Sequence, residues 1–216
     1  MLKFYHAPWS RSSGMLWLLE ELGVDYDLIL PDIRAEGGAP EDYRAVQPNK
    51  KVPAIDHDGT IVTERAAITI YLTDVFAEAG LAPAIGDPSR AKYLTWTVYS
   101  DSVFDPVICA KAHKLTYVSN DYPFGLFDDM VANVEKHLTR NEYAAGSRFT
   151  AADTQLASGV AFTMNVLRVL PERQVFKDYV ARIEERPAYQ RAQKRDYELA
   201  MQIPQFRDAG AHPAAG

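Results

Sequence analysis

The stretch KKVPAI, residues 50–55, carries the feature that decides the fold of this chain. Pro53 stands directly ahead of a short run of residues typical of a β-strand. Proline has no backbone N–H and restricts the residue before it to extended geometry, so inside a sheet it removes a ladder hydrogen bond. The stretch therefore predicts either an edge strand or a backbone distortion at Val52 that the protein uses.

Patterns on both sides of this stretch predict a series of strands and helices. Alternating side chains indicate strands, and apolar residues three or four positions apart indicate helices. The expected elements are a strand at 2–5, a helix at 12–22 that stops at Gly23, a strand at 26–30, a short helix from Pro40, a hairpin around Asp58-Gly59 and a helix at 64–76. This is the order of a thioredoxin-like fold.

In a thioredoxin-like fold the proline before the third strand is commonly cis. We therefore expect a cis bond between Val52 and Pro53, which turns the N–H and C=O of Val52 outward. An extended peptide can then pair with Val52 like an added strand. The alternative is that Pro53 merely starts an edge strand.

The second half of the chain shows only helical spacing. Residues 80–89 are rich in Gly, Pro and Ala and lack periodicity, which is typical of a linker. Beyond them, helical spacing runs through 89–117, 125–141, 151–170 and 175–186. The expected domains are an α/β thioredoxin-like domain at 1–79, the linker at 80–89, an all-α C-terminal domain at 90–206 and a flexible tail at 207–216.

Composition excludes several classes of protein. The 216 residues carry a formal net charge of -6 without a stripe of Lys and Arg, which argues against nucleic acid as a partner. The single cysteine, Cys109, excludes an internal disulfide and suits a reducing compartment. Residues 1–10 hold no long apolar run, and the apolar region 156–170 is interrupted by polar residues. We therefore expect no secretory signal, no membrane span and a cytoplasmic protein.

The segment Thr63-Glu64-Arg65-Ala66 opens the helix expected at 64–76. The first N–H groups of a helix have no partner within it and lie at the positive end of its dipole, so they favour a carboxylate. The Glu64 side chain beside them can hold an ammonium group. Together these features suit the α-amino-acid end of a ligand; the alternative is that Glu64 only complements the helix dipole.

Five segments together resemble the soluble glutathione S-transferases, and the bacterial, serine-type members most. They are FYHAPWSRSS (4–13), LWLLEELGVDYD (16–27), QPNKKVPAI (47–55), DGTIVTERAAITIYL (58–72) and FTAADTQLA (149–157). The resemblance covers nearly the whole chain and implies glutathione as co-substrate. This tripeptide has an extended peptide segment and a γ-linked amino-acid end, which are what Val52 and Glu64 suit. The resemblance also implies a homodimer, with helices 64–76 and 91–103 as its surfaces and Asp101 near the interface.

The resemblance places a thiol-activating Ser, Tyr or Cys just after the first strand, which here falls in residues 8–13. We take Ser10 as this residue, with Ser12 as its main rival and Ser13 and Tyr5 as further alternatives. A serine hydroxyl is too weak a base to remove a thiol proton. It can instead donate a hydrogen bond that favours the thiolate, and the start of the helix acts in the same direction. The alternative for Ser10 is a helix N-cap.

The resemblance also assigns the residues that bind glutathione. They are Lys51, Val52, Pro53, Glu64 and Arg65. Many relatives have serine where this chain has Arg65; an arginine can pair with a carboxylate instead, or it can point to solvent or to a partner subunit. Lys51 stands where relatives meet the glycine end of glutathione, although lysines on a surface loop are more often only solvated.

A second pocket, for a hydrophobic electrophile, is expected between the two domains. Its expected lining is Trp9, Tyr99, Phe104, Ile108 and His113. Aromatic residues at helical spacing are also typical of a core, so the region is better supported than the individual residues. The five histidines are scattered, with no carboxylate or cysteine at ligand spacing, so no metal is expected.

Residues 150–153, TAAD, fit the Ser/Thr-x-x-Asp capping signal of a buried helix, with Phe149 as a hydrophobic staple. Thr150 and Asp153 are each expected to contribute about 1 kcal/mol to stability and nothing to catalysis.

These features predict a glutathione transferase that activates the glutathione thiol for nucleophilic attack on a hydrophobic small molecule, as in detoxification. The loop after the first strand holds no cysteine, which argues against a dithiol oxidoreductase. Two alternatives stay open. One is a glutathione-dependent peroxidase or disulfide reductase, in which glutathione supplies the thiol; the other is a non-catalytic binding module of the same fold.

Overall fold

The computed structural model describes residues 1–208, which form two compact units. The first unit contains residues 1–79 together with the C-terminal segment that begins at Pro187, and the second contains residues 80–186. The expected division placed 187–206 in the helical domain. In the structure this segment packs with the first unit instead, because helix α8 (Pro187–Ala200) lies against helix α1 (Ser13–Leu22).

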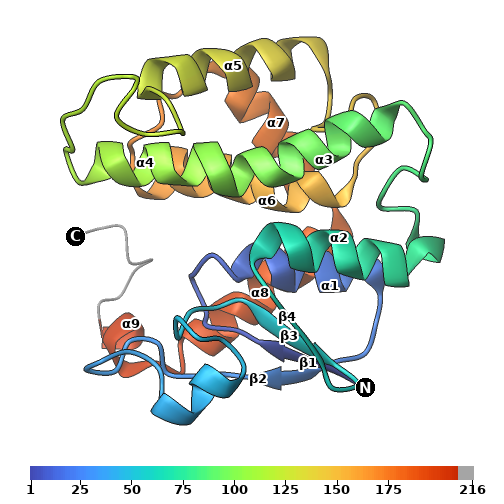
Figure 1. Cartoon of the computed structure of the whole chain (residues 1–216), viewed down its shortest axis with the longest axis vertical. Coiled ribbons are helices and arrows are strands. Elements are labelled where there is room, and N and C mark those ends of the chain that lie inside the picture. Colours follow the sequence, from blue (N-terminus) through green and yellow to red (C-terminus); the bar gives the residue numbers. More distant parts are fainter. Residues whose placement is uncertain (209–216) are drawn as a thin grey trace. The chain divides into compact units, whose positions relative to one another are not determined.

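The first unit is built on a four-stranded mixed sheet of thioredoxin-like topology (Figure 1). Its strands are β1 (Leu2–Tyr5), β2 (Asp27–Ile29), β3 (Ala54–His57) and β4 (Thr60–Thr63), in the order β2-β1-β3-β4. β1 pairs with β2 in parallel and with β3 antiparallel, and β3 and β4 form an antiparallel hairpin. The turn of this hairpin, Asp58-Gly59, has φ values of 51° and 87°, as expected for a tight two-residue connection.

Helices cover both faces of the sheet. Figure 1 shows α1 and α2 (Arg65–Val75) along one face. The opposite face buries Tyr5 and Ala54 against Tyr43 of the short 3₁₀ helix η1 (Glu41–Ala45). The remaining helical segments of this unit are η2 (Ala77–Ala79) and α9 (Pro204–Asp208). Helix α1 ends at Gly23 with φ 66°, the left-handed cap that the sequence predicts.

The second unit consists of helices, as predicted. They are α3 (Ser89–Tyr99), the π-helical turn η3 (Ser100–Phe104), α4 (Asp105–Ala112), α5 (Phe127–Arg140), α6 (Ala151–Ala161), the π-helical turn η4 (Phe162–Val166) and α7 (Gln174–Glu184). The helical segments predicted at 89–117 and 151–170 begin where the structure has them but extend past the C-terminal ends of α4 and η4. The chain leaves the helical conformation at Lys114 and Arg168, whose φ values are 56° and 53°.

The predicted capping box at the start of α6 is confirmed. The Thr150 side chain accepts the Asp153 backbone N–H, and Asp153 accepts the Thr150 backbone N–H at 2.9 Å. Asp153 also accepts the Ala144 N–H and the Tyr179 hydroxyl, both at 2.7 Å. Burial raises the pKa of Asp153 to about 6 against the lowering effect of these donors. Asp153 therefore joins three segments of the second unit, which is more than a local cap.

Two further expectations concern a membrane span and the C-terminal tail. No helix within residues 1–208 has both the length and the apolar composition needed to cross a membrane. Of the tail expected at 207–216, Arg207 and Asp208 belong to α9, and the rest lies outside the described residues.

Candidate functional site

Three segments named from the sequence leave the sheet of the first unit at the same end. Tyr5 ends β1 opposite Ala54, the first residue of β3, and Ala54 also pairs with Thr63 at the end of β4. The loop that follows β1, the residues that precede β3 and the start of α2 are thus set side by side by strand register. The register brings Val52, Glu64 and the loop that contains Ser10 to the same end of the sheet.

Ser10 lies in the loop between β1 and α1 and is partly exposed. Its hydroxyl donates to the Ala7 carbonyl at 2.7 Å and accepts the Ser12 N–H at 3.2 Å. Its own N–H donates to Ser13 Oγ at 3.3 Å. These contacts stabilise the turn before α1; the N-cap position of α1 is occupied by Ser12, so the alternative role of Ser10 as the N-cap is wrong. They also hold its hydroxyl at the mouth of α1, where a helix end favours negative charge.

Ser12, the main rival, has a different environment. Its side chain is fully buried, and its Oγ lies 2.8 Å from Ser10 Oγ, 2.7 Å from His6 Nδ1 and 3.1 Å from the Ala7 N–H nitrogen. A hydroxyl enclosed in this way has no open side for a ligand. Its surroundings favour Ser10 over Ser12 as the residue that meets a thiol.

His6 and Asp196 complete this site, and the sequence analysis missed both roles. His6 Nε2 lies 2.9 Å from Asp196 Oδ1, and both Asp196 oxygens lie 3.3 Å from the Trp9 backbone nitrogen, which donates to them. His6 is 0% exposed and Asp196 is 3% exposed. Asp196 belongs to α8, so no local pattern could have linked it to a histidine at the end of β1.

Arg34 holds the same loop from its carbonyl side. Its guanidinium donates to the Pro8 carbonyl at 2.8 Å and to the Trp9 carbonyl at 3.3 Å, and it lies over the Phe206 ring at 4.7 Å. Burial lowers the pKa of Arg34, while the charges of Asp32 and Asp196 act in the opposite direction. The loop is therefore fixed by a half-buried cation and a buried carboxylate.

The Val52-Pro53 bond is cis, which confirms the prediction. Tyr43 donates its hydroxyl to the Lys51 carbonyl at 3.0 Å, and the Lys51 N–H donates to Gln47 Oε1 at 3.2 Å. Burial raises the pKa of Tyr43, which keeps its hydroxyl protonated as a donor. Within residues 1–208, the N–H and C=O of half-buried Val52 make no hydrogen bond. They are available to an extended peptide.

Glu64 is the N-cap residue of α2, and its side chain is exposed. Its φ of 69° lies in the left-handed region, which a non-glycine residue seldom adopts. Arg65, the first residue of α2, is partly buried. The start of α2 thus presents a carboxylate and a guanidinium at the end of β4.

The residues predicted to line an electrophile pocket have diverse environments. Trp9 belongs to the first unit and packs on Phe206, with ring centroids 4.8 Å apart. In the second unit, Phe104 and Ile108 are 3% and 2% exposed and belong to the core. Tyr99, the last residue of α3, is half-buried, and His113 is exposed. The electrophile pocket stays a prediction.

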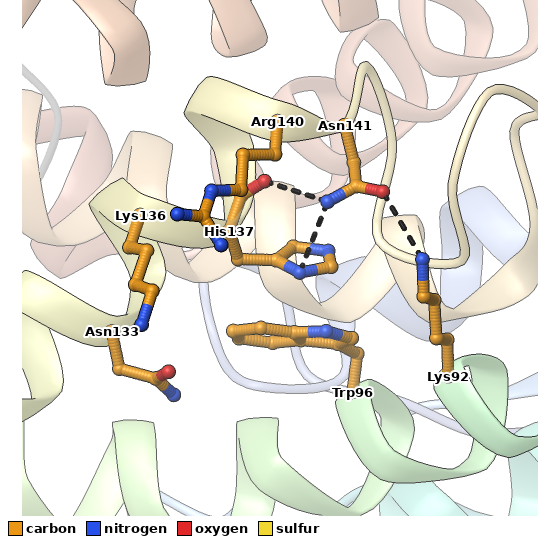
Figure 2. Close-up of a pocket in the computed structure, with 7 residues that line it drawn as sticks. All are labelled: Lys92, Trp96, Asn133, Lys136, His137, Arg140 and Asn141. Atoms are coloured by element: carbon orange, nitrogen blue, oxygen red, sulfur yellow. Dashed lines mark hydrogen bonds between the residues drawn. The ribbon is translucent and has the colours of Figure 1, made fainter.

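A different pocket, of about 440 Å³, lies in the second unit. It is lined by Lys92 and Trp96 of α3 and by Asn133, Lys136, His137, Arg140 and Asn141 at the end of α5. Figure 2 shows the His137 imidazole over the Trp96 indole, with ring centroids 4.1 Å apart. Burial lowers the pKa of His137, and its Nε2–H donates to the Ala144 carbonyl. Cations at this place offset the negative end of α5, and none of the predicted site residues lines the pocket.

The part of the chain from residue 1 to residue 208 holds no group of three His, Cys, Asp or Glu side chains that could ligate a metal. Cys109, the single cysteine of the sequence, is a partly buried residue of α4. The polar groups gathered around Ser10 are hydroxyls, the buried imidazole of His6 and the buried carboxylate of Asp196.

Comparisons with known proteins point in one direction. A family model described as "Glutathione S-transferase, N-terminal domain" matches residues 1–74. The chain is 30% identical to glutathione S-transferase GstA of Escherichia coli over 204 residues, which cover 88% of this chain and 96% of that protein. It is 29% identical to glutathione S-transferase 3 of Schizosaccharomyces pombe over 209 residues, 87% of this chain and 85% of that protein. A solved structure of a sphingomonad glutathione S-transferase complexed with glutathione has a TM-score of 0.72 and 26% identity, covering 90% of this chain and 98% of that one.

Proposed function

Because the chain belongs to the glutathione S-transferase family, we propose that it binds glutathione and activates its thiol for attack on a hydrophobic electrophilic small molecule. The observation that carries the proposal is the strand register. It sets three features at one end of the sheet: a partly exposed serine, the backbone N–H and C=O of Val52 without hydrogen bonds within residues 1–208, and the start of a helix.

Each part of glutathione has a counterpart at this end of the sheet. The cysteinyl peptide segment pairs with the N–H and C=O of Val52, beside Pro53, as an added strand does. The γ-glutamyl end lies at the start of α2, where Glu64 meets its ammonium and Arg65 its carboxylate. The side chain of Lys51, which is exposed, is the proposed partner of the glycine carboxylate.

In this pose the thiol lies against Ser10, at the start of α1. The hydroxyl of Ser10 donates a charge-assisted hydrogen bond to the thiolate, and the helix end stabilises the same charge. A free thiol titrates near ~8.5, so lowering its pKa by about two units makes the thiolate the main form at neutral pH. This corresponds to about 2.7 kcal/mol, which one such hydrogen bond and a helix end can supply.

The second substrate binds beside the thiol, where Trp9 of the loop that carries Ser10 is the proposed contact within the first unit. The active form is a homodimer that uses the exposed surfaces of α2 and α3, with Asp101 near the contact. The aromatic ring of Trp9 suits a hydrophobic electrophile.

The test is retention on immobilised glutathione, followed by a conjugation assay with a generic aromatic electrophile. Retention together with conjugation supports the transferase. Retention with turnover only of hydroperoxides or disulfides favours the peroxidase or reductase alternative. Failure to bind glutathione contradicts the proposal and favours a non-catalytic module of the same fold.

A further inference from the structure

A continuous chain of hydrogen bonds runs from a buried carboxylate to Ser10. Asp196 Oδ1 lies 2.9 Å from His6 Nε2, His6 Nδ1 lies 2.7 Å from Ser12 Oγ, and Ser12 Oγ lies 2.8 Å from Ser10 Oγ. His6 and Ser12 are fully buried, whereas Ser10 is partly exposed. The chain connects an imidazole in the interior with the hydroxyl that we assign to the thiol.

Neighbouring contacts set the direction of these hydrogen bonds. The Trp9 N–H donates to both oxygens of Asp196, so the carboxylate is an acceptor, and His6 Nε2 carries the hydrogen that lies between them. The single hydrogen of Ser12 Oγ has two acceptors within reach, His6 Nδ1 at 2.7 Å and the Ala7 carbonyl at 3.2 Å. The contact with His6 is the shorter, so the relay takes Nδ1 as the acceptor of the Ser12 hydroxyl. Ser12 Oγ accepts the Ala7 N–H and has a second lone pair for the Ser10 hydroxyl. The single hydrogen of Ser10 Oγ is donated to the Ala7 carbonyl at 2.7 Å, so the relay requires it to turn from that carbonyl to Ser12 Oγ, 2.8 Å away.

We propose that His6 is the final acceptor of the glutathione thiol proton, with Ser10 and Ser12 as the relay and Asp196 as the positioning residue that stabilises the imidazolium. The inference rests on the proposed function, because it requires the thiol to lie against Ser10. The S–H bond breaks and its proton passes to Ser10 Oγ. The Ser10 hydroxyl proton passes to Ser12 Oγ, and the Ser12 hydroxyl proton passes to His6 Nδ1. A neutral thiol and a neutral imidazole become a thiolate and an imidazolium.

The transfer reverses every hydrogen bond along the chain. Afterwards the imidazolium of His6 donates to Asp196 and to Ser12, Ser12 donates to Ser10, and Ser10 donates to the thiolate. One movement of protons therefore removes the thiol proton and leaves the serine hydroxyl oriented to stabilise the anion. A serine alone cannot act as the base, whereas an imidazole beside a carboxylate can.

The charges around His6 are compatible with this step. Asp196 on α8 is the carboxylate in direct contact with His6. Arg34 is the cation that donates to the Pro8 and Trp9 carbonyls, and the charge of Asp196 acts to raise its pKa. Phe4 stacks on the imidazole at 5.3 Å and keeps that side dry. The new positive charge on His6 is thus formed against a carboxylate within an otherwise enclosed site.

The test measures the number of protons released to solvent for each thiolate formed when glutathione binds near neutral pH. Ultraviolet difference absorbance counts thiolates, and calorimetry in buffers of different ionisation enthalpy counts released protons. For the unaltered chain we expect thiolate formation with proton release near zero, because the proton stays on His6. In Asp196→Asn and His6→Asn, release should rise towards one proton per thiolate. The kcat/KM for conjugation should fall about 100-fold with little change in the KM for glutathione.

Asp153→Asn is the matched control, because it alters an equally buried carboxylate that also accepts backbone N–H groups. It should leave proton release near zero. NMR of the His6 ring nitrogens gives an independent readout, and they should change to the imidazolium pattern when glutathione binds.

Two results would count against the relay in different ways. A thiolate accompanied by one released proton in the unaltered chain, with His6 still neutral, overturns the relay and leaves the proposed function standing. Absence of any thiolate in the unaltered chain overturns the proposed function and the relay with it. Both readouts use the unaltered chain, so the decision does not depend on whether the variants fold.

Discussion

Two buried carboxylates anchor the segments that lead into helices α6 and α1, and they differ in where their hydrogen bonds end. Asp153 accepts the N–H groups of Ala144 and Thr150 and the hydroxyl of Tyr179. All three donors belong to buried residues of the second unit. The arrangement is closed: it fixes the start of α6 and leaves no polar group for a ligand.

Asp196 anchors the loop before α1 in a similar way, through the Trp9 N–H and the ring of His6. Its hydrogen bonds continue through Ser12 to Ser10, which is partly exposed. A buried carboxylate therefore does not by itself mark a reactive site. What distinguishes the two is whether a path of polar groups leads from the carboxylate to the surface.

The largest expected effect is on turnover, and it should follow a change at the Asp196 site and not at the Asp153 site. Ser10→Ala removes the hydroxyl at the exposed end of the hydrogen-bond path that begins at Asp196. Turnover should fall about 1000-fold, equivalent to about 4 kcal/mol of activation free energy. Glutathione affinity should change far less, because the peptide contacts at Val52 remain. Steady-state kinetics with glutathione and an aromatic electrophile measure both quantities.

The same kind of change at the closed site is the control for Ser10→Ala. Thr150→Ala should leave turnover per folded molecule as it is. If Ser10→Ala keeps full turnover while Ser12→Ala abolishes it, the thiol partner has been assigned to the wrong serine.

Asp153→Ala should have the largest effect on stability. The sequence pattern alone suggests about 1 kcal/mol for a cap. The structure adds the hydroxyl of Tyr179 and the N–H of Ala144, which would lose their acceptor inside the core, so the free energy of unfolding should drop by about 3 kcal/mol. Urea unfolding measures this loss; a melt indistinguishable from that of the unaltered chain would show that the closed site is not structural.

The pH dependence of stability should carry the signature of Asp153. Its pKa is raised from 3.8 to about 6, so in that range the folded chain keeps a proton that the unfolded chain has lost. The stabilising contribution of this proton is complete below pH 3.8 and is lost as the pH rises through about 6. From about pH 4.5 upward, the unaltered chain should lose about 2 kcal/mol relative to Asp153→Asn. Parallel pH profiles of the two unfolding free energies would contradict the raised pKa.

Thr150→Ala should have the smallest effect. It removes one hydroxyl that caps the start of α6, and the free energy of unfolding should fall by about 1 kcal/mol. Thr150→Ser keeps the capping oxygen and should recover most of the loss in the same unfolding experiment. Equal losses in the two variants would mean that the methyl group of Thr150, and not its hydroxyl, is what stabilises the helix.

The closed site could be predicted from the sequence because its main contacts are local. Thr150 and Asp153 are three positions apart, and that spacing is itself the capping signal. The left-handed cap at Gly23 and the hairpin at Asp58-Gly59 are local in the same sense. In each case a few neighbouring residues determine the backbone conformation, so a short segment of sequence is enough to predict it.

The site that joins Asp196, His6 and Ser10 could not be predicted because these residues lie far apart in the chain. Helix α8 buries Ala188, Ala192, Asp196 and Ala200, which are spaced by four but are small or charged. Such a face allows close approach to α1, yet it carries little of the large apolar periodicity by which helices are predicted. Without α8, His6 has no visible partner and appears as one of five scattered histidines.

The position of α8 also bears on how the protein is made. Ribosomes deliver a chain from its amino end, so the strands and α1 emerge long before Asp196 does. The sheet can pair its strands as soon as Thr63 is out, but the imidazole of His6 gains its carboxylate only when α8 returns to the first unit. A nascent chain stalled before α8 would thus hold the strands and His6 without the carboxylate of Asp196, and the proposed relay would be complete only once α8 has been made.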